Sequence, residues 1–375
     1  MKEQEKKETK KTLLAILSIF LTTRIAIVII SYLSTLVIKP GRYFSEFPEP
    51  NSIMNLFFKW DSQWYMDIIY NGYVYVPGQE SSIGFFPLYP MLVKLASFVF
   101  GNPKLMGFLI SNVALFLACI YMYKLVKLDY KDKKEDIALK SVFYMLIFPL
   151  TFFFSIFYTE GLFMFLVISC FYYARKKQWM IAGILGFFLS LTRSLGVFVF
   201  IPILVEYLDI DYPFKIKKKV KKDVLWLLLI PAGLLSFMLY CYIKFGSFLT
   251  YFHSKAAWGN QFSSVFTTLG TITRYGLFYK IIFLSSIILT LIIIIYLIYS
   301  GARFSYVVYC LLFLYLYLSA GILEGIPRYI SILFPLYLGI ALASRKKYLE
   351  YIFVLFSMML LTLFLILFVN GYWFN

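Results

Sequence analysis

Residues 13–38 read LLAILSIFLTTRIAIVIISYLSTLVI, and this stretch decides the class of fold. It is longer than the about 20 apolar residues that a membrane-spanning helix needs, and it follows a Lys-rich polar segment at 1–12. The stretch is too long for the core of a signal peptide and has no small-residue cleavage site. It therefore predicts an uncleaved membrane-spanning helix whose polar N-terminal segment stays in the cytoplasm.

The remainder of the chain repeats this pattern of long apolar runs. Of its 375 residues, 61% are hydrophobic and 15% are charged, whereas soluble domains carry about 25% charged residues. We predict an all-α integral membrane protein in which residues 1–375 form a single bundle of about eleven transmembrane helices. The predicted spans are 13–38, 104–126, 139–157, 160–174, 178–192, 195–208, 224–245, 277–299, 304–322, 329–343 and 349–370.

Clusters of Lys and Arg predict how the spans are oriented, because basic residues are enriched in cytoplasmic loops. If every basic cluster is to lie in the cytoplasm, the apolar run 88–100 must lie along the membrane surface. Only then does the cluster at 124–140 return to the cytoplasmic side. Residues 39–87 and 246–276 then form two extracytoplasmic loops, and we predict short amphipathic helices in the first. The basic clusters lie at 1–12, 124–140, 175–177, 215–222, 303 and 345–347.

The same distribution of charge argues against nucleic acid as a partner. The net charge is +17, but the basic residues form separate loop clusters with no basic face of interleaved stacking aromatic side chains. The four cysteines lie within apolar runs and His253 is the single histidine, so neither a disulfide framework nor a zinc site is expected. We expect membrane lipids as neighbours, and no metal or other cofactor.

The first outer loop contains the most informative residues, KWDSQWY at 59–65. If residues 57–70 form a helix, Asp61 lies in the middle of an apolar face, while Lys59 and Ser62 lie on the other side. A carboxylate on an apolar face is costly unless it is paired or used. Two interpretations stay open. Asp61 caps a helix that begins at Ser62, with Trp60 and Trp64 as interfacial anchors, or Asp61 performs chemistry.

Several short motifs resemble those of one family of membrane enzymes. WDSQWY at 60–65, NGY at 71–73 and FFPLYP at 85–90 resemble sequences of the GPI mannosyltransferase II (PIG-V) family, within the GT-C superfamily of membrane glycosyltransferases. FYTE at 157–160, TRSLG at 192–196, and RY at 328–329 followed by FP at 334–335 look like its later signatures. Order and spacing hold from about residue 55 to 340, and the short loops look more like prokaryotic relatives.

The resemblance implies a GT-C-like bundle that uses a lipid-linked sugar. Its members are expected to hold an acidic catalytic residue in the first outer loop, and that role carries over to Asp61 as a general base. Glu80 falls where relatives often have an acidic residue. The implied substrates are a polyprenyl-phosphate sugar donor, with mannose as the implied hexose, and a lipid or glycan acceptor. The site is expected to face outward from the cell membrane, or into the endoplasmic reticulum lumen in a eukaryote.

Further candidate residues lie at the predicted outer ends of spans and in the second outer loop. Arg193, Arg328 and Lys255 are expected to bind the donor phosphate, because a phosphate needs a cation. Arg193 could instead snorkel, and Arg328 could instead pair with Glu324. The expected substrate-binding residues are Trp60, Trp64, Tyr65, Glu80, Glu160, His253 and Trp258.

Some of these residues also have structural interpretations. Glu160 is compatible with a charge favoured at a helix N-terminus, and a lone histidine such as His253 is more often a surface or packing residue. Arg24, within the first span, is expected to pair with a neighbouring acid or to snorkel.

The leading alternative function is a transporter or flippase for a lipid-linked or small solute. Many spans with ionisable residues fit it equally well, but transporters often contain inverted repeats, and the sequence has no internal repeat. A non-catalytic subunit of a glycosylation complex is a third reading, which the intact motif around Asp61 disfavours.

Overall fold

The computed structural model describes residues 2–130, 136–210, 215–216 and 219–372, and these form helices joined by loops. Parts of two predicted basic loops, 131–135 and 217–218, lie outside the described residues. The helices are α1 (Lys2–Val37), α2 (Ile53–Leu56), α3 (Asp61–Asn71), α4 (Leu88–Phe100), α5 (Pro103–Asp129), α6 (Ile137–Ile147), α7 (Glu160–Arg175), α8 (Trp179–Ser190), α9 (Phe200–Tyr207), α10 (Leu229–Phe245), α11 (Thr250–Ala257), α12 (Val265–Gly270), α13 (Leu277–Tyr299), α14 (Phe304–Leu318), α15 (Ile326–Ile330), α16 (Pro335–Ala343) and α17 (Lys347–Val369).

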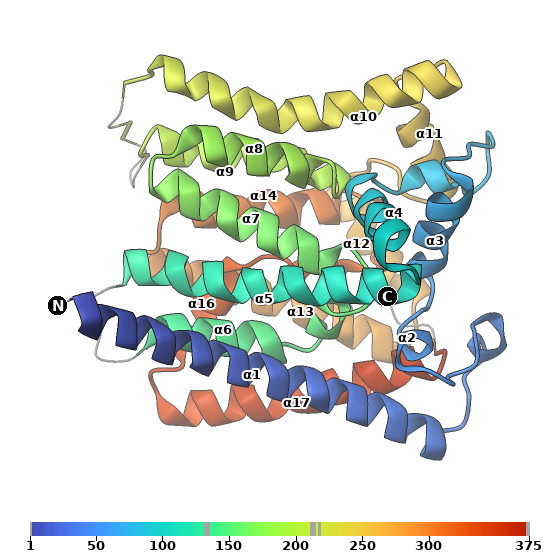
Figure 1. The fold of residues 1–375 in the computed structure, drawn as a ribbon, viewed down its shortest axis with the longest axis horizontal. Helices are drawn as coiled ribbons and strands as arrows, with labels where there is room; N and C mark the ends of the chain where they lie inside the picture. The colour runs from blue at the N-terminus through green and yellow to red at the C-terminus, as the bar shows by residue number, and fades with distance from the viewer. Residues whose placement is uncertain (1, 131–135, 211–214, 217–218, 373–375) are drawn as a thin grey trace.

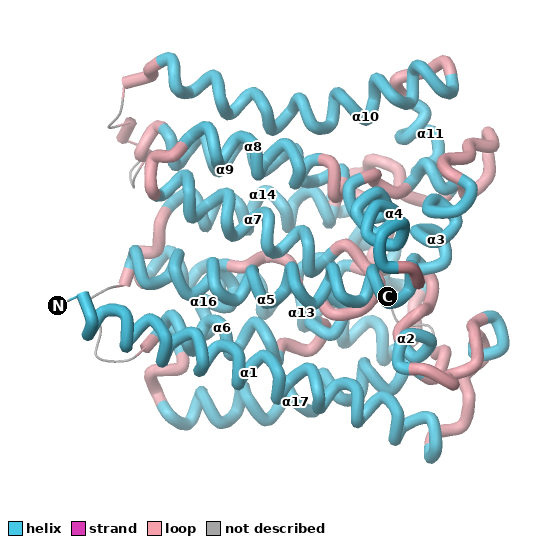
Figure 2. The backbone as a smooth tube through the Cα atoms, in the orientation of Figure 1, coloured by secondary structure: helices cyan, strands magenta, loops and turns pink. Residues whose placement is uncertain are grey.

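Most of the longer helices lie roughly side by side in one bundle, with the N-terminus at its left end in Figure 1. Figure 2 shows loops and short helices gathered at the right-hand end, around α3, α4 and α11. We call this the α3 end of the bundle and the other the opposite end. Within residues 39–87, α2 and α3 confirm the prediction of short helices.

Five helical segments are long and apolar enough to cross a membrane: Glu8–Val37, Pro103–Asp129, Lys222–Phe245, Leu277–Tyr299 and Lys347–Val369. Only 22% of the most apolar window of the first, and 28% of that of the last, is buried inside the protein. Such extensive exposed apolar surface would drive aggregation in water, whereas the lipid of a membrane suits it. The helical architecture is consistent with a membrane protein.

Shorter apolar helices occupy several other predicted spans. α7, α8 and α14 correspond to the spans predicted at 160–174, 178–192 and 304–322. α4 covers the run 88–100 in 13 residues, fewer than the about 20 that a membrane crossing needs. Figure 1 draws α4 nearly end-on at the α3 end, across the direction of the bundle.

Two predicted spans are wrong as continuous helices. In 139–157, α6 ends at Ile147, and Phe148 is extended because the residue before a proline avoids helical geometry. In 329–343 the chain forms two short helices, α15 and α16, and the second begins with Pro335. Both interruptions are almost entirely buried, so protein surrounds the backbone groups that they leave outside regular helix.

Arg24 of α1 makes hydrogen bonds with the interruption that follows α6. Its Nη2 donates to the carbonyl oxygen of Leu146 at 2.7 Å, and its Nη1 donates to Ser155 Oγ at 2.6 Å. A carbonyl near a helix C-terminus has no partner within the helix, and a buried guanidinium can satisfy it. The expectation that Arg24 pairs with an acid or snorkels is therefore wrong.

Candidate active site

Asp61 is the first residue of α3, so the helix supposed at 57–70 begins four residues later. Trp60 occupies the N-cap position with φ of 43°, a left-handed conformation that is uncommon for a residue other than glycine. The Trp60 ring packs against Phe47 and Phe368, with ring centroids 5.1 and 4.8 Å apart. The capping interpretation of Asp61 is wrong, because Trp60 takes the N-cap position and Asp61 bonds elsewhere.

The loop that leads to this motif is held by the segment that follows α17. The backbone N–H of Gly41 donates to the carbonyl oxygen of Asn370 at 2.8 Å, and that of Tyr43 donates to Gly371 at 3.1 Å. The hydroxyl of Tyr372 donates to the carbonyl oxygen of Lys39 at 3.0 Å. Two parts of the chain that are distant in sequence are therefore joined at residues 39–43.

Lys59 lies on the buried side of the motif, and the expectation that it faces away is wrong. Its side chain is 0% exposed, and Nζ lies 5.1 and 4.7 Å from the ring centroids of Phe44 and Phe47. Nζ has no hydrogen-bond partner in the described chain, and burial lowers the pKa of Lys59 to about 8. Ser62, expected on the same polar side, is also buried and donates to the carbonyl oxygen of Phe157 at 3.2 Å.

Four charged side chains form a linked network at the α3 end. Arg328 Nη2 donates to Asp61 Oδ2 at 2.9 Å, and Arg328 Nε donates to Glu160 Oε1 at 2.6 Å. The same Glu160 oxygen accepts from Arg193 Nη1 at 2.6 Å. The alternative pairing of Arg328 with Glu324 is therefore wrong. The side chain of Asp61 is 23% exposed and that of Glu160 is 0% exposed, so of these two carboxylates only Asp61 is accessible.

Irregular backbone brings these side chains together. Glu160 starts α7 directly after the buried segment 148–159, and Arg193 lies in the short connection that follows α8. Arg328 lies in α15, a helix of 5 residues. These interruptions in regular helix let Glu160, Arg193 and Arg328 meet, and Arg328 joins them to Asp61.

Close packing fixes the position of Arg328. The centre of its guanidinium lies 4.9 Å from the ring centroid of Phe153 and 4.5 Å from that of Tyr158. The hydroxyl of Tyr158 donates to the carbonyl oxygen of Lys59 at 3.1 Å and so joins this ring to the motif. Sequence reasoning gave Tyr158 no role, although its place in the FYTE motif was an available signal.

An aromatic wall lies beside the network. The Trp64 ring centroid is 5.9 Å from that of Phe85 and 5.0 Å from that of Trp258. Lys255 Nζ lies 5.3 Å from the Phe85 centroid and 5.7 Å from the Trp258 centroid. Gly84 lies close to this wall: a Cβ there would lie 3.1 Å from Trp258 Nε1, so the indole ring would have to move by a few tenths of an ångström.

Apart from its contacts with the Phe85 and Trp258 rings, Lys255 makes neither an ion pair nor a hydrogen bond with the described residues. Burial lowers its pKa to about 8, an effect that Asp61 opposes and that Arg193 and Arg328 reinforce. These mutual effects mean that Lys255 and the network act on one another electrostatically. Its ammonium is therefore available to an incoming anion.

The remaining candidates are divided between the site and the surface. Tyr65 is buried, with ring centroids 5.2 Å from Phe85 and 5.4 Å from Tyr89. Glu80 is exposed, but its charge acts on Lys255. His253 is exposed on α11, and no described contact joins it to the network. That Glu80 and His253 bind substrate stays a prediction.

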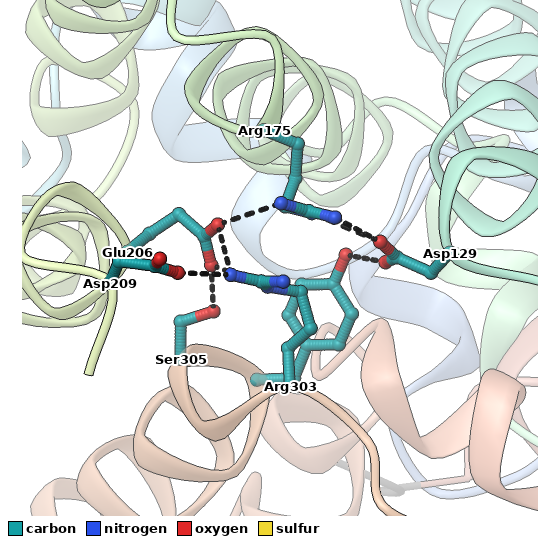
Figure 3. A network of polar contacts seen from close by, with 7 residues as sticks. Asp129, Arg175, Glu206, Asp209, Arg303 and Ser305 are labelled. Atoms are coloured by element: carbon teal, nitrogen blue, oxygen red, sulfur yellow. Dashed lines mark hydrogen bonds and ion pairs between the residues drawn. The ribbon is translucent and has the colours of Figure 1, made fainter. Parts of the chain in front are cut away.

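A second ion network, which sequence reasoning missed, lies at the opposite end of α7 (Figure 3). Arg175 pairs with Asp129 at 2.6 Å and with Glu206 at 3.2 Å. Arg303 pairs with Glu206 at 2.9 Å and with Asp209 at 3.1 Å. The sequence predicts these arginines only as members of basic loops, and no motif singles out the carboxylates that they bind.

Within the described part of the chain, no three His, Cys, Asp or Glu side chains gather as metal ligands would. No protein-family model matches the chain, and no curated protein matches it either. The resemblance to the GPI mannosyltransferase II family therefore stays a prediction that rests on the motifs.

Proposed function

We propose that this chain is a membrane glycosyltransferase that transfers a hexose from a polyprenyl-phosphate donor to a hydroxyl of a lipid or glycan acceptor. The proposal includes about eleven membrane crossings, with α4 on the surface and the α3 end outside the cell. One observation carries it. A partly exposed carboxylate, Asp61, shares a network with two arginines and stands near the unpaired ammonium of Lys255.

The balance of charge in the site suits a phosphodiester. Asp61 and Glu160 offset Arg193 and Arg328, and Lys255 then adds one positive charge. A sugar joined to a lipid through one phosphate carries a single negative charge. Cationic side chains that face the phosphate would also stabilise the charge that develops as it leaves.

In the proposed step, Asp61 takes the proton of the acceptor hydroxyl as the acceptor oxygen attacks the anomeric carbon. Asp61 Oδ1 has no partner among the described residues, so one carboxylate oxygen is available for this proton. The new carbon–oxygen bond forms while the bond from the anomeric carbon to the phosphate oxygen breaks, and its electron pair leaves with the polyprenyl phosphate. A positioned base contributes about 10²–10⁴ in rate, and a single displacement inverts the anomeric carbon.

The experiment that tests this function is a transfer assay. Purified full-length protein is incubated with radiolabelled polyprenyl-phosphate mannose and candidate acceptor lipids, and the products are separated. Label joined covalently to an acceptor, with inverted configuration, supports the proposal. Label that only crosses the bilayer of a vesicle supports the transporter or flippase instead.

No metal is required in this proposal, because the phosphate leaves as an anion that Lys and Arg side chains can stabilise. Transfer is expected to continue in EDTA. Loss of transfer in EDTA, with recovery when a divalent cation is added back, would contradict this expectation.

A further inference from the structure

Glu160 occupies a special place in the network, because one of its oxygens holds both arginines. Oε1 accepts from Arg193 Nη1 and from Arg328 Nε, each at 2.6 Å. The side chain is 0% exposed, so Glu160 has no path to a substrate that approaches from outside. A buried carboxylate between two guanidinium groups also prevents these like charges from repelling one another.

The geometry of Arg328 shows what this arrangement does for Asp61. Arg328 uses Nε for Glu160 and Nη2 for Asp61. These two N–H groups lie on one edge of the guanidinium and could together bind both oxygens of a single carboxylate. Because Glu160 takes Nε, Asp61 receives one N–H only, and its Oδ1 stays open.

Resting on the proposed function, we propose that Glu160 is a positioning residue for this transfer. It holds Arg328 so that Asp61 accepts one hydrogen bond from this arginine and keeps its second oxygen open. Without Glu160, Arg328 closes on both oxygens of Asp61 and occupies the base. Glu160 itself touches neither donor nor acceptor.

The test replaces Glu160 with Gln and measures kcat and the donor KM for polyprenyl-phosphate mannose. We expect kcat to fall about a hundredfold, as a misplaced reacting group does, while the donor KM does not rise. Glu206→Gln is the matched control, because Glu206 also holds two arginines but at the opposite end of α7. This control is expected to keep the wild-type kcat per folded molecule.

Each alternative gives a different result. A rise in donor KM with kcat unchanged would mean that Glu160 contacts substrate, and an unchanged kcat per folded molecule would mean a structural role alone; either outcome overturns the inference. If Glu160→Gln does not fold, Glu160→Asp keeps the charge one methylene further back, and it is expected to show the same fall in kcat with less loss of folded protein. Absence of transfer by the wild-type protein overturns the proposed function itself, and the inference with it.

Discussion

The two ion networks at the ends of α7 contain the same kinds of residue but differ in how fully these residues are hydrogen-bonded. α7 has 16 residues, which at about 1.5 Å per residue separates its ends by roughly 24 Å. At each end a buried glutamate holds two arginines: Glu160 holds Arg193 and Arg328, and Glu206 holds Arg175 and Arg303. The two networks differ in whether all of their carboxylate oxygens accept hydrogen bonds.

In the opposite-end network the buried carboxylate oxygens are all satisfied. Asp129 Oδ1 accepts from Arg175 and Oδ2 accepts from Tyr306, while Glu206 Oε2 accepts from Ser305 at 2.6 Å (Figure 3). At the α3 end, Asp61 Oδ1 and Glu160 Oε2 have no partner among the described residues. A saturated network ties helices together. At the α3 end Glu160 Oε2 is buried, so only the oxygen of the partly exposed Asp61 is open to a contact from outside.

The comparison is tested most strongly by the two aspartates. Asp61→Asn removes the proposed base, so we expect kcat in the transfer assay to fall by about 10²–10⁴ while polyprenyl phosphate still binds. Asp129→Asn, the matched change in the saturated network, is expected to leave kcat per folded molecule unchanged. If Asp61→Asn transfers sugar at the wild-type rate, or both variants lose activity alike, the two networks do not differ in function.

We expect the saturated network at the opposite end to contribute to the stability of the fold and not to the rate of transfer. Glu206→Gln leaves two arginines without their shared carboxylate, and breaking a buried ion pair costs about 3–5 kcal/mol. Thermal unfolding of the purified protein in detergent should therefore begin at a clearly lower temperature than in the wild type. An unchanged unfolding temperature would show that this network does not hold α7, α9 and α14 together.

Lys255 gives a smaller effect that depends on pH. Burial lowers its pKa to about 8, so its ammonium is present below pH 8 and is lost as the pH rises through that value. We expect the donor KM to rise about tenfold between pH 7 and pH 9, in proportion to the loss of the charged form. Lys255→Arg stays charged over this range and should remove the rise; a rise that persists in this variant must come from another group.

His253 is expected to give the smallest effect. Its side chain is exposed on α11, and exposed substitutions away from special features change free energies by within about 0.5 kcal/mol. His253→Ala should therefore keep kcat and KM within about twofold of the wild type. A larger loss would bring this residue into the site, in agreement with the prediction from sequence.

The sequence could predict where the long apolar helices lie and which charged residues of its motifs lie at the same end of the bundle. The helix at Leu88–Phe100 agrees with its predicted bounds, and Asp61, Glu160, Arg193 and Arg328 come from four separate motifs that do meet. Apolar composition and motif order need no knowledge of which helices are neighbours. These features can therefore be predicted from a single sequence.

The breaks and the pairings could not be predicted in this way. Hydropathy is averaged over many residues, so it passes over the interruption at Phe148 that Pro149 causes. The burial of Lys59 depends on Phe44 and Phe47 of a loop with no regular pattern. Pairing Arg303 with Glu206 requires α9 and α14 to be adjacent, which nothing in their separate sequences indicates.

The bonds between the loop at Lys39 and the segment after α17 have a consequence during synthesis. Tyr372 and Lys39 are 333 positions apart, so a ribosome that adds about 5–20 residues per second leaves on the order of 20–60 s between them. During that interval the turn at Trp60 lacks Phe368, one of the two rings that brace it. Until Phe368 has been synthesised, the nascent chain therefore carries Asp61 directly after a turn that lacks this contact.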